Sequence, residues 1–463
     1  MSQQQNLKTI ITASATGSLI EWYDLLLAII LSPVLSIHLF PEGDSRFLET
    51  LAIVISSYLI RPFGSLIFGF IGDKSGRKKS FLLSLLLMGG ATFLIGCIPS
   101  YNQVGWLAPV MLLVLRLCQG LAVSGEYAGG IIYVAEHAPK GKRGYYTGFI
   151  QATIPLGLLI CLIVVFTTEY FMSAETFEAY GWRIPFLLSS VLVVVSYYIR
   201  QKLGESPIYK KLKATGDVSS NPIKETFRTE GNFRLIMLAV FGGNAAQATI
   251  MQSAQFLTLF FLQQSAYIDL KSSVLILGIA TFFSVPFFQH FSALSDRIGR
   301  KKVIIPGLIL SAIVIPLVFY GYGAIGNPHG LQVTHAISFD TTLKLAGLSF
   351  LLCFASAMVY GPMGIFMLEL FPAKIRYTSM AFAYNIGNGV LGGSTTLIGE
   401  ALRRAAIFGP LLMPFVSLLY PLIMILTAII VSLGWVPETY QNKLHTDDEE
   451  DEVSPSSITK SNI

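Results

Sequence analysis

The sequence predicts an all-α membrane protein in which twelve transmembrane helices form two six-helix halves. Three observations support this prediction: an apolar composition, twelve long apolar stretches and an internal repeat. Of the 463 residues, 53% are hydrophobic and only 13% are charged, and the mean hydropathy is +0.62. An ordinary soluble domain has roughly 25% charged residues. So few charged residues could not cover the surface of a soluble protein of this length. An exterior that faces lipid is therefore expected.

The apolar stretches have the length that a membrane-spanning helix requires, which is about 20 residues. The first of them contains Glu21 and Asp24 and lacks an A-x-A cleavage site, so it is interpreted as a retained helix and not as a signal peptide. The twelve stretches are approximately 14–37, 48–71, 81–99, 107–135, 145–168, 184–200, 234–262, 272–293, 303–323, 343–369, 377–400 and 408–435.

The polar segments between these stretches divide the chain. The longest internal one, 201–233, contains two prolines and many Lys and Arg, and it is expected to be a cytoplasmic linker between an N-terminal half, 1–200, and a C-terminal half, 234–436. The remaining segment, 437–463, contains the run DDEEDE. Because like charges repel and little apolar surface is present, it is expected to form a disordered acidic cytoplasmic tail.

The positive charges lie in short clusters between apolar stretches. The clusters lie in the loops that follow the even-numbered predicted helices. The loops that follow the odd-numbered helices contain fewer positive charges, with Arg403 and Arg404 as a mild exception. The positive-inside rule therefore predicts a multi-pass protein of the bacterial inner membrane with both termini in the cytoplasm. The same distribution argues against nucleic acid as a partner, although the formal net charge is +5.

Two short segments recur six helices apart. GDKSGRKK at 72–79 follows the second stretch and returns as SDRIGRKK at 295–302 after the eighth. EHAPKGKRG, from Glu136, follows the fourth stretch and returns as ELFPAKIRY, from Glu369, after the tenth. Because both segments recur at the same spacing of six helices, the sequence predicts two structurally repeated halves. In transporters this arrangement places the binding site between the halves.

The repeated loops contain acids as well as basic residues, which a loop that only sets topology does not need. We expect these charges to form ion pairs that hold one closed state and break when the protein opens. The predicted gating residues are Asp73, Arg77, Glu136, Arg143, Asp296, Arg300, Glu369 and Arg376.

Together with further motifs, these loops carry a resemblance to a known family. The G-x-x-x-D-x-x-G-R-K-K loop and its second copy resemble the signature loop of the major facilitator superfamily. The other motifs are similar to those of its metabolite:proton symporters, which include proline/betaine, 2-oxoglutarate, citrate and shikimate transporters. These motifs are GSLIEWYDL at 17–25, SSYLIRPFGSLIFG at 56–69, RLCQGLAVSGEYAGG at 116–130, GWRIPF at 181–186, ESP at 205–207 and ELFPAKIRYTSMAFAYNIGNGVLGG at 369–393.

The resemblance covers nearly the whole chain and departs from the family pattern at two small residues. Ser124 and Ser295 stand where glycine is usual, and close packing survives both changes. The resemblance implies the major facilitator fold and a monomeric, proton-coupled symporter that takes up a small polar metabolite by alternating access. The metabolite would be an organic acid or a zwitterionic osmolyte or amino acid. An exporter or uniporter of the same fold, or a membrane sensor that does not transport, are the alternatives.

Acidic side chains within the bilayer are candidates for proton coupling, because ionisable groups there are costly. Glu21 and Asp24 are three residues apart on one helical face, so their simultaneous ionisation is disfavoured and one of them is expected to carry a proton. Glu126 lies among small residues that permit tight helix packing. Each acid has an alternative structural role in bonding to another helix or to a basic loop.

Buried arginines are candidates for substrate binding, because a guanidinium is always charged and needs an acceptor. Arg116 is expected either to pair with Glu21 or Asp24 or to bind a substrate carboxylate through two hydrogen bonds. A structural role is favoured for Arg61.

Neutral polar residues on the predicted helices either line a polar cavity or hold helices together. The predicted substrate-binding set consists of Arg116, Gln119, Tyr23, Gln151, Asn244, Gln247, Tyr384, Asn385 and Asn388.

No cofactor or metal is expected. The four cysteines lie in apolar runs without metal-ligand spacing. No Walker loop, Rossmann fingerprint, zinc motif or nucleophile elbow occurs in a credible context, so neither nucleotide hydrolysis nor enzymatic catalysis is predicted. The expected partners are a small-molecule substrate, protons and the lipid bilayer.

Overall fold

The computed structural model describes residues 7–75, 77–201, 221–371, 375–405 and 413–440. Within these ranges all regular secondary structure is helical, apart from one isolated bridge between Ile268 and His335. Each of the twelve stretches predicted from the sequence is helical over most of its described residues. The all-α architecture predicted from composition is therefore confirmed.

Most predicted spans of the N-terminal half consist of two consecutive helices. The elements are α1 (Leu7–Ile30), α2 (Ser32–Leu39), α3 (Arg46–Leu59), α4 (Arg61–Ser75), α5 (Arg77–Gly96), α6 (Tyr101–Val104), α7 (Leu107–Val123), α8 (Glu126–His137), α9 (Arg143–Gln151), α10 (Thr153–Tyr170), α11 (Ala174–Thr176), η1 (Phe177–Gly181) and α12 (Arg183–Gln201).

In the C-terminal half, two spans include π-helical segments, denoted η. The short helix α14 (Pro222–Arg228) precedes this half. The elements that follow are α15 (Asn232–Ala239), η2 (Val240–Asn244), α16 (Ala245–Gln252), η3 (Ser253–Leu257), α17 (Thr258–Gln264), α18 (Leu270–Ile298), α19 (Lys301–Gly326), α20 (Phe339–Leu370), α21 (Arg376–Tyr384), η5 (Asn385–Gly392), α22 (Thr395–Arg404), α23 (Met413–Val416) and α24 (Leu419–Gly434).

Among the described residues, eight helices are long and apolar enough to cross a membrane. The bent pair Ser14–Ile30 and Ser32–Leu39 makes a ninth, and Leu82–Gly96 and Leu419–Gly434 are apolar but shorter. The remaining predicted span, α21–η5–α22, is more polar because it carries buried Asn and charged residues along the bundle interior. A span that contributes polar groups to the bundle interior is therefore less uniformly apolar along its length.

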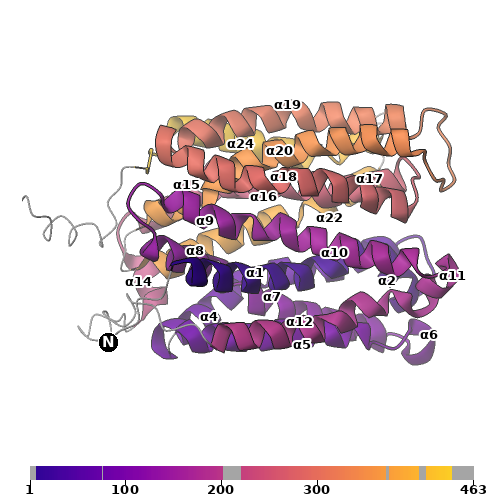
Figure 1. Cartoon of the computed structure of the whole chain (residues 1–463), viewed down its shortest axis with the longest axis horizontal. Helices are drawn as coiled ribbons and strands as arrows, with labels where there is room; N and C mark the ends of the chain where they lie inside the picture. Colours follow the sequence, from indigo (N-terminus) through magenta and orange to yellow (C-terminus); the bar gives the residue numbers. More distant parts are fainter. Residues whose placement is uncertain (1–6, 76, 202–220, 372–374, 406–412, 441–463) are drawn as a thin grey trace, which may run out of the picture.

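The two halves lie side by side and meet along two pairs of spans. In Figure 1 the helices of the first half (indigo to magenta) lie mostly below those of the second half (orange to yellow). Across the boundary α18 packs against α9 and α10, and α21 and η5 pack against α4. The interface is thus built by the second and eleventh predicted spans and by the fifth and eighth.

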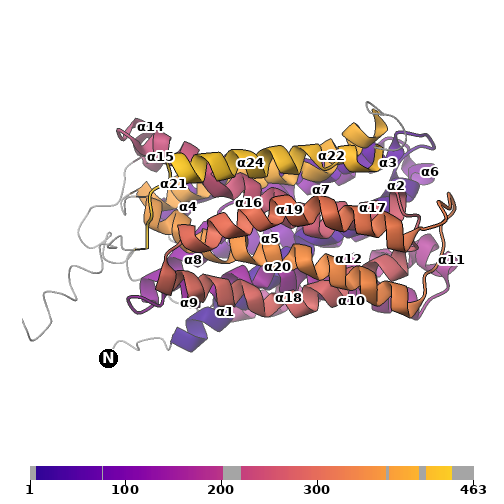
Figure 2. The ribbon, with the colours of Figure 1, turned by 90° about the horizontal axis from the view of Figure 1, so that it is seen from above.

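The two ends of the bundle carry different connections. The start of α1, the helix α14 and the α18–α19 turn lie at one end, whereas α2, α6 and α11 lie at the other (Figures 1 and 2). This agrees with a topology in which the N-terminus, the linker and the second signature loop share one side. That this side faces the cytoplasm stays a prediction from the loop charges.

The break in the second span has a local cause. Helix α3 ends at Leu59 and α4 begins at Arg61, with Pro62 at its second position. Proline has no backbone N–H and cannot continue the hydrogen-bond ladder of the preceding turn. The break places Arg61 at the start of a new helix in the middle of the bundle.

Candidate functional site

A small cavity lies between the two halves. Its volume is about 20 Å³, little more than one water molecule needs. Neither acids nor basic residues occur among its lining side chains. The lining residues are Trp22, Leu26, Tyr58 and Ile154 from the first half and Ala248, Met251, Gln252, Gln255, Phe256, Tyr360 and Asn388 from the second. This aromatic and amide-rich lining between repeated halves suits a small organic solute.

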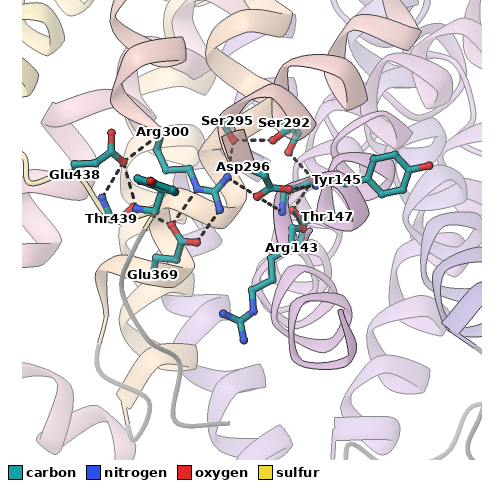
Figure 3. A network of polar contacts seen from close by, with 12 residues as sticks. Arg143, Tyr145, Thr147, Ser292, Ser295, Asp296, Arg300, Glu369, Glu438 and Thr439 are labelled. Atoms are coloured by element: carbon teal, nitrogen blue, oxygen red, sulfur yellow. Dashed lines mark hydrogen bonds and ion pairs between the residues drawn. The ribbon is translucent and has the colours of Figure 1, made fainter. Parts of the chain in front are cut away.

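One end of the interface is closed by the second signature loop. Asp296 on α18 accepts hydrogen bonds from the backbone N–H groups of Gly144 (2.9 Å) and Tyr145 (2.8 Å) in the first turn of α9. The hydroxyl of Ser292 donates to the Gly144 carbonyl at 2.8 Å. A carboxylate at a helix N-terminus is favoured by the unpaired N–H groups and by the helix dipole. These bonds join the two halves directly (Figure 3).

The same carboxylate is tied into an ion-pair network within the second half. Arg300 donates to Asp296 at 2.8 Å and to both carboxylate oxygens of Glu369, at 2.8 and 3.0 Å. Burial acts to lower the pKa of Arg300, but the hydrogen bonds and charge of Glu369, together with Asp296, raise it above its ordinary value. Arg300 therefore stays charged and aligns two acids from different helices.

The start of the predicted tail belongs to this network. Glu438 accepts from the backbone N–H groups of Arg300 (2.9 Å) and Lys301 (3.0 Å), and Thr439 donates to Glu369 at 3.0 Å. The prediction of a disordered tail from residue 437 is therefore wrong at its beginning, because Glu438 caps the N-terminus of α19 (Figure 3). Residues 441–463 lie outside the described residues.

A second group of contacts joins the two halves. The rings of Tyr127 and Tyr384 stack with centroids 3.8 Å apart. Gln151 accepts from the Tyr127 hydroxyl at 2.9 Å and donates to the Tyr360 carbonyl at 2.9 Å. Asn385 donates to the Ser124 carbonyl at 2.7 Å. These contacts close the path from the cavity to the Asp296 end of the bundle.

The opposite end is also bridged. Arg404 donates to the carbonyl of Asp44 at 2.5 Å, while Glu400 holds both Arg403 and Arg404 in ion pairs. Phe47 of the second span and Phe260 of the seventh make an edge-to-face contact at 5.4 Å. Contacts between the halves therefore lie on both sides of this small cavity.

Arg116 is fully buried and holds the first half together. Its guanidinium donates to the carbonyls of Val54 (2.7 and 2.9 Å) and Leu25 (3.2 Å), to Gln119 (2.6 Å) and to Ser57 (2.7 Å). A guanidinium has five N–H donors, and these bonds use all of them. In this structure Arg116 has no donor left for a substrate carboxylate. One expectation was that it pairs with Glu21 or Asp24, but its acceptors are backbone, amide and hydroxyl oxygens.

The predicted proton-coupling acids lie in the bundle interior as far as they are described. Asp24 is 0% exposed, and one of its oxygens accepts from Ser189 at 2.6 Å. Its other oxygen has no hydrogen-bond partner among the described residues. Glu21 is buried as well. The side chain of Glu126 lies outside the described part of the structure.

The neutral residues predicted to bind substrate separate into three groups. Asn388 lines the cavity, and Tyr384 reaches Tyr360 of its lining through a hydroxyl contact of 3.2 Å. Gln247 is buried, and both of its amide atoms lack partners among the described residues. The others form bonds within or between helices: Tyr23 with the Pro185 carbonyl, Gln119 with Thr92, Asn244 with the Ala383 and Tyr384 carbonyls, and Gln151 and Asn385 across the halves.

The predicted gating residues are partly described. Asp296, Arg300 and Glu369 form the network above. Arg143 is buried and its side chain points away from that network in Figure 3, and Arg376 donates to the Phe371 carbonyl at 3.1 Å. Glu136 lies in the last turn of α8. The side chains of Asp73 and Arg77 lie outside the described residues.

Several residues of the site were missed by sequence reasoning. Tyr58 and Tyr360 line the cavity, and Glu438 and Thr439 complete the network around Arg300 and Glu369. An isolated tyrosine in an apolar stretch does not indicate a binding site, because most such residues pack in the bundle core. The segment around Glu438 follows the last span and precedes an acidic run, so its composition indicated a tail.

No group of three or more His, Cys, Asp or Glu residues that could hold a metal ion occurs in the part of the chain that the structure describes.

Comparisons with known proteins agree with this geometry. The sequence profile of the Major Facilitator Superfamily matches residues 24–397. The alpha-ketoglutarate permease of Escherichia coli strain K12 is 30% identical over 402 residues, which cover 85% of this chain and 87% of the relative. A putative metabolite transport protein of Haemophilus influenzae is 31% identical, covering 86% and 88%. A putative proline/betaine transporter of Staphylococcus aureus strain MSSA476 is 28% identical, covering 87% and 83%.

Among solved structures, the proton:xylose symporter XylE bound to 6-bromo-6-deoxy-D-glucose has the same fold. It matches with a TM-score of 0.70 and 19% identity, covering 95% of this chain and 97% of the other. The profile match, the metabolite permeases among the relatives and the cavity between two helical halves lead to one conclusion. The chain belongs to the major facilitator superfamily and is a multi-pass membrane transporter of small metabolites.

Proposed function

We propose that this transporter takes up a carboxylate-bearing metabolite together with protons, and that Asp24 carries the proton. The observation behind the proposal is the environment of Asp24. It is completely buried, it accepts one hydrogen bond from a neutral hydroxyl, and it forms no ion pair among the described residues. An ionised carboxylate without a counter-charge is costly in an apolar interior, so occlusion favours the protonated acid.

Alternating access would couple this proton to the solute. When the Asp296 end opens, water reaches the interior and Asp24 can release its proton; when the other end opens, the acid can take up a new one. The contacts at the two ends cannot all persist in an open state, because they join residues of opposite halves. The gate therefore supports the exchange of access that symport requires.

The names of the relatives support the chemical class of the solute. The Escherichia coli relative is named for alpha-ketoglutarate and the Staphylococcus aureus relative for proline and betaine. All three compounds carry a carboxylate. We propose that the end with the α18–α19 turn faces the cytoplasm and that a monomer is sufficient, because the cavity is formed by one chain.

Uptake into proteoliposomes tests the proposal. Labelled 2-oxoglutarate, proline and glycine betaine are supplied outside, with an imposed inward proton gradient or with an uncoupler. At least one compound should accumulate only with the gradient. Accumulation that is indifferent to the gradient would remove the symport claim and favour a uniporter. Loss of preloaded solute against a proton influx would instead indicate an exporter.

The role of Asp24 is tested by Asp24→Asn. This variant keeps the hydrogen bond from Ser189 but cannot ionise, so it should lose gradient-driven accumulation and retain exchange of labelled for unlabelled solute. The matched control is Asp340→Asn, which neutralises an exposed acid of an i,i+4 pair with Lys344. The control should accumulate like the natural protein. Gradient-driven accumulation in Asp24→Asn would exclude Asp24 as the proton carrier.

A further inference from the structure

Arg61 occupies an unusual position beside the central cavity. It is 1% exposed and lies at the break of the second span, at the start of α4. Its Cζ atom lies 4.0 Å from the ring centroid of Tyr58, and its stem packs against Gly389 of η5, where a Cβ atom would be 3.3 Å from Arg61 Cδ. Arg61 therefore lies between the two halves, against residues of the second and eleventh spans.

One edge of the Arg61 guanidinium is unused. Its Nε and Nη2 atoms are buried and have no hydrogen-bond partner among the described residues. These two N–H groups point in parallel along one side of the guanidinium plane and match the two oxygens of a carboxylate. Arg116 differs, because all five of its donors are taken. Of Arg61 and Arg116, only Arg61 has a fork available.

The surroundings of Arg61 do not neutralise its charge. The Tyr58 ring stacks on its guanidinium, but none of the ion pairs found in the described residues includes Arg61. A buried, permanently charged group without a counter-ion is unfavourable. The site is thus incomplete until an anion enters it.

The cavity lies next to this charge. Tyr58, on which Arg61 stacks, and Tyr360 both line the cavity, and Asn388 adds an amide from the same η5 segment as Gly389. The lining itself contains no cation, and Arg61 lies directly behind it, stacked on Tyr58, so an anionic group that reaches past Tyr58 meets this guanidinium. Asn388, Gln252 and Gln255 supply neutral groups for the remainder of the solute.

We propose that Arg61, and not Arg116, binds a carboxylate group of the substrate through its Nε–Nη2 edge, and that Arg116 is a structural residue of the first half. The inference rests on the proposed function, in which the central cavity holds the solute. It can be tested by binding in detergent without any proton gradient, so its failure is distinguishable from a failure of proton coupling.

The experiment measures thermal unfolding of the purified full-length protein. The probes are 2-oxoglutarate, citrate, proline and glycine betaine, each beside its ester or amide at equal concentration. At least one acid should raise the unfolding temperature of the natural protein, and its derivative without the carboxylate charge should not. Arg61→Gln should lose this shift. Arg61→Lys keeps the charge without the fork and should bind roughly ten- to a hundredfold more weakly, the loss of about one charge-assisted hydrogen bond.

Stability without ligand separates a binding role from a structural one. Arg61→Gln removes an uncompensated charge, so its unfolding temperature without ligand should equal or exceed that of the natural protein. Arg116→Gln leaves several buried acceptors without donors and should unfold at a lower temperature. Three results would overturn the proposal: no carboxylate stabilises the natural protein, Arg61→Gln keeps the full ligand shift, or Arg61→Gln is destabilised as strongly as Arg116→Gln.

Discussion

Replacing Asp296 with alanine should open the end of the bundle that this residue closes. The carboxylate accepts two hydrogen bonds from backbone N–H groups of the other half, at 2.9 and 2.8 Å. A hydrogen bond to a charged group contributes roughly 1.5–3 kcal/mol, so two of them favour the closed arrangement by at least about 3 kcal/mol. The bond from Arg300 does not enter this sum, because both partners belong to the second half and move together.

A change of about 3 kcal/mol alters the ratio of closed to open forms by roughly 150-fold, since 1.36 kcal/mol corresponds to a factor of ten. If the natural protein populates the open form at about 1%, a typical minor-state population, the open form becomes the majority in Asp296→Ala. The same substitution should therefore slow transport, because the carrier would remain open on one side.

Distances between spin labels at Lys142 and Arg297 measure this opening. Both residues are exposed and flank the gate, one before α9 and the other near the end of α18. The natural protein should show one short distance, and Asp296→Ala should show a longer distance as the main population. Asp340→Ala, which removes an exposed acid of α20, is the control and should match the natural protein. An unchanged distance distribution in Asp296→Ala would refute the reasoning.

Two further predictions concern packing and capping. In Gly361→Ala, the new Cβ would lie 2.5 Å from the Phe288 carbonyl oxygen and 3.1 Å from the Ser292 backbone nitrogen. Because neither backbone atom can move without shifting α18, thermal unfolding should show a loss of about 1–3 kcal/mol. Gly347→Ala on the same helix meets no atom within 4 Å and should be neutral or slightly stabilising; equal behaviour of the two variants would contradict the packing argument. In Glu438→Ala, α19 loses its cap, worth about 1 kcal/mol, so the Arg300 and Lys301 amides should exchange hydrogen roughly fivefold faster. Unchanged exchange would show that Glu438 does not hold this terminus.

The fold could be predicted from local properties of the sequence. Whether a stretch spans the membrane depends on the apolar character of about 20 consecutive residues, and each predicted stretch is helical over most of its described residues. The repeated loops indicated that Asp296, Arg300 and Glu369 pair at one end of the bundle, and the structure contains these ion pairs. Their gating role stays a prediction.

The roles of the buried polar residues could not be predicted in the same way. Arg116 and Arg61 are both arginines within apolar spans, and sequence reasoning assigned the substrate to the first and a structural role to the second. We propose the reverse, because Val54 and Leu25, which lie 62 and 91 residues from Arg116, bring their carbonyls to its guanidinium. A helix break and two neighbouring tyrosines leave Arg61 with a free edge.

The sequence by itself therefore determined the helices, their order and the class of protein, since these follow from composition and from a repeat along the chain. Only the tertiary structure decided which buried donors are satisfied, where the cavity lies and that Glu438 belongs to the Arg300 network. Hydrogen-bond satisfaction depends on atoms brought together from distant spans, and the one-dimensional pattern of apolar and polar residues does not record those distances.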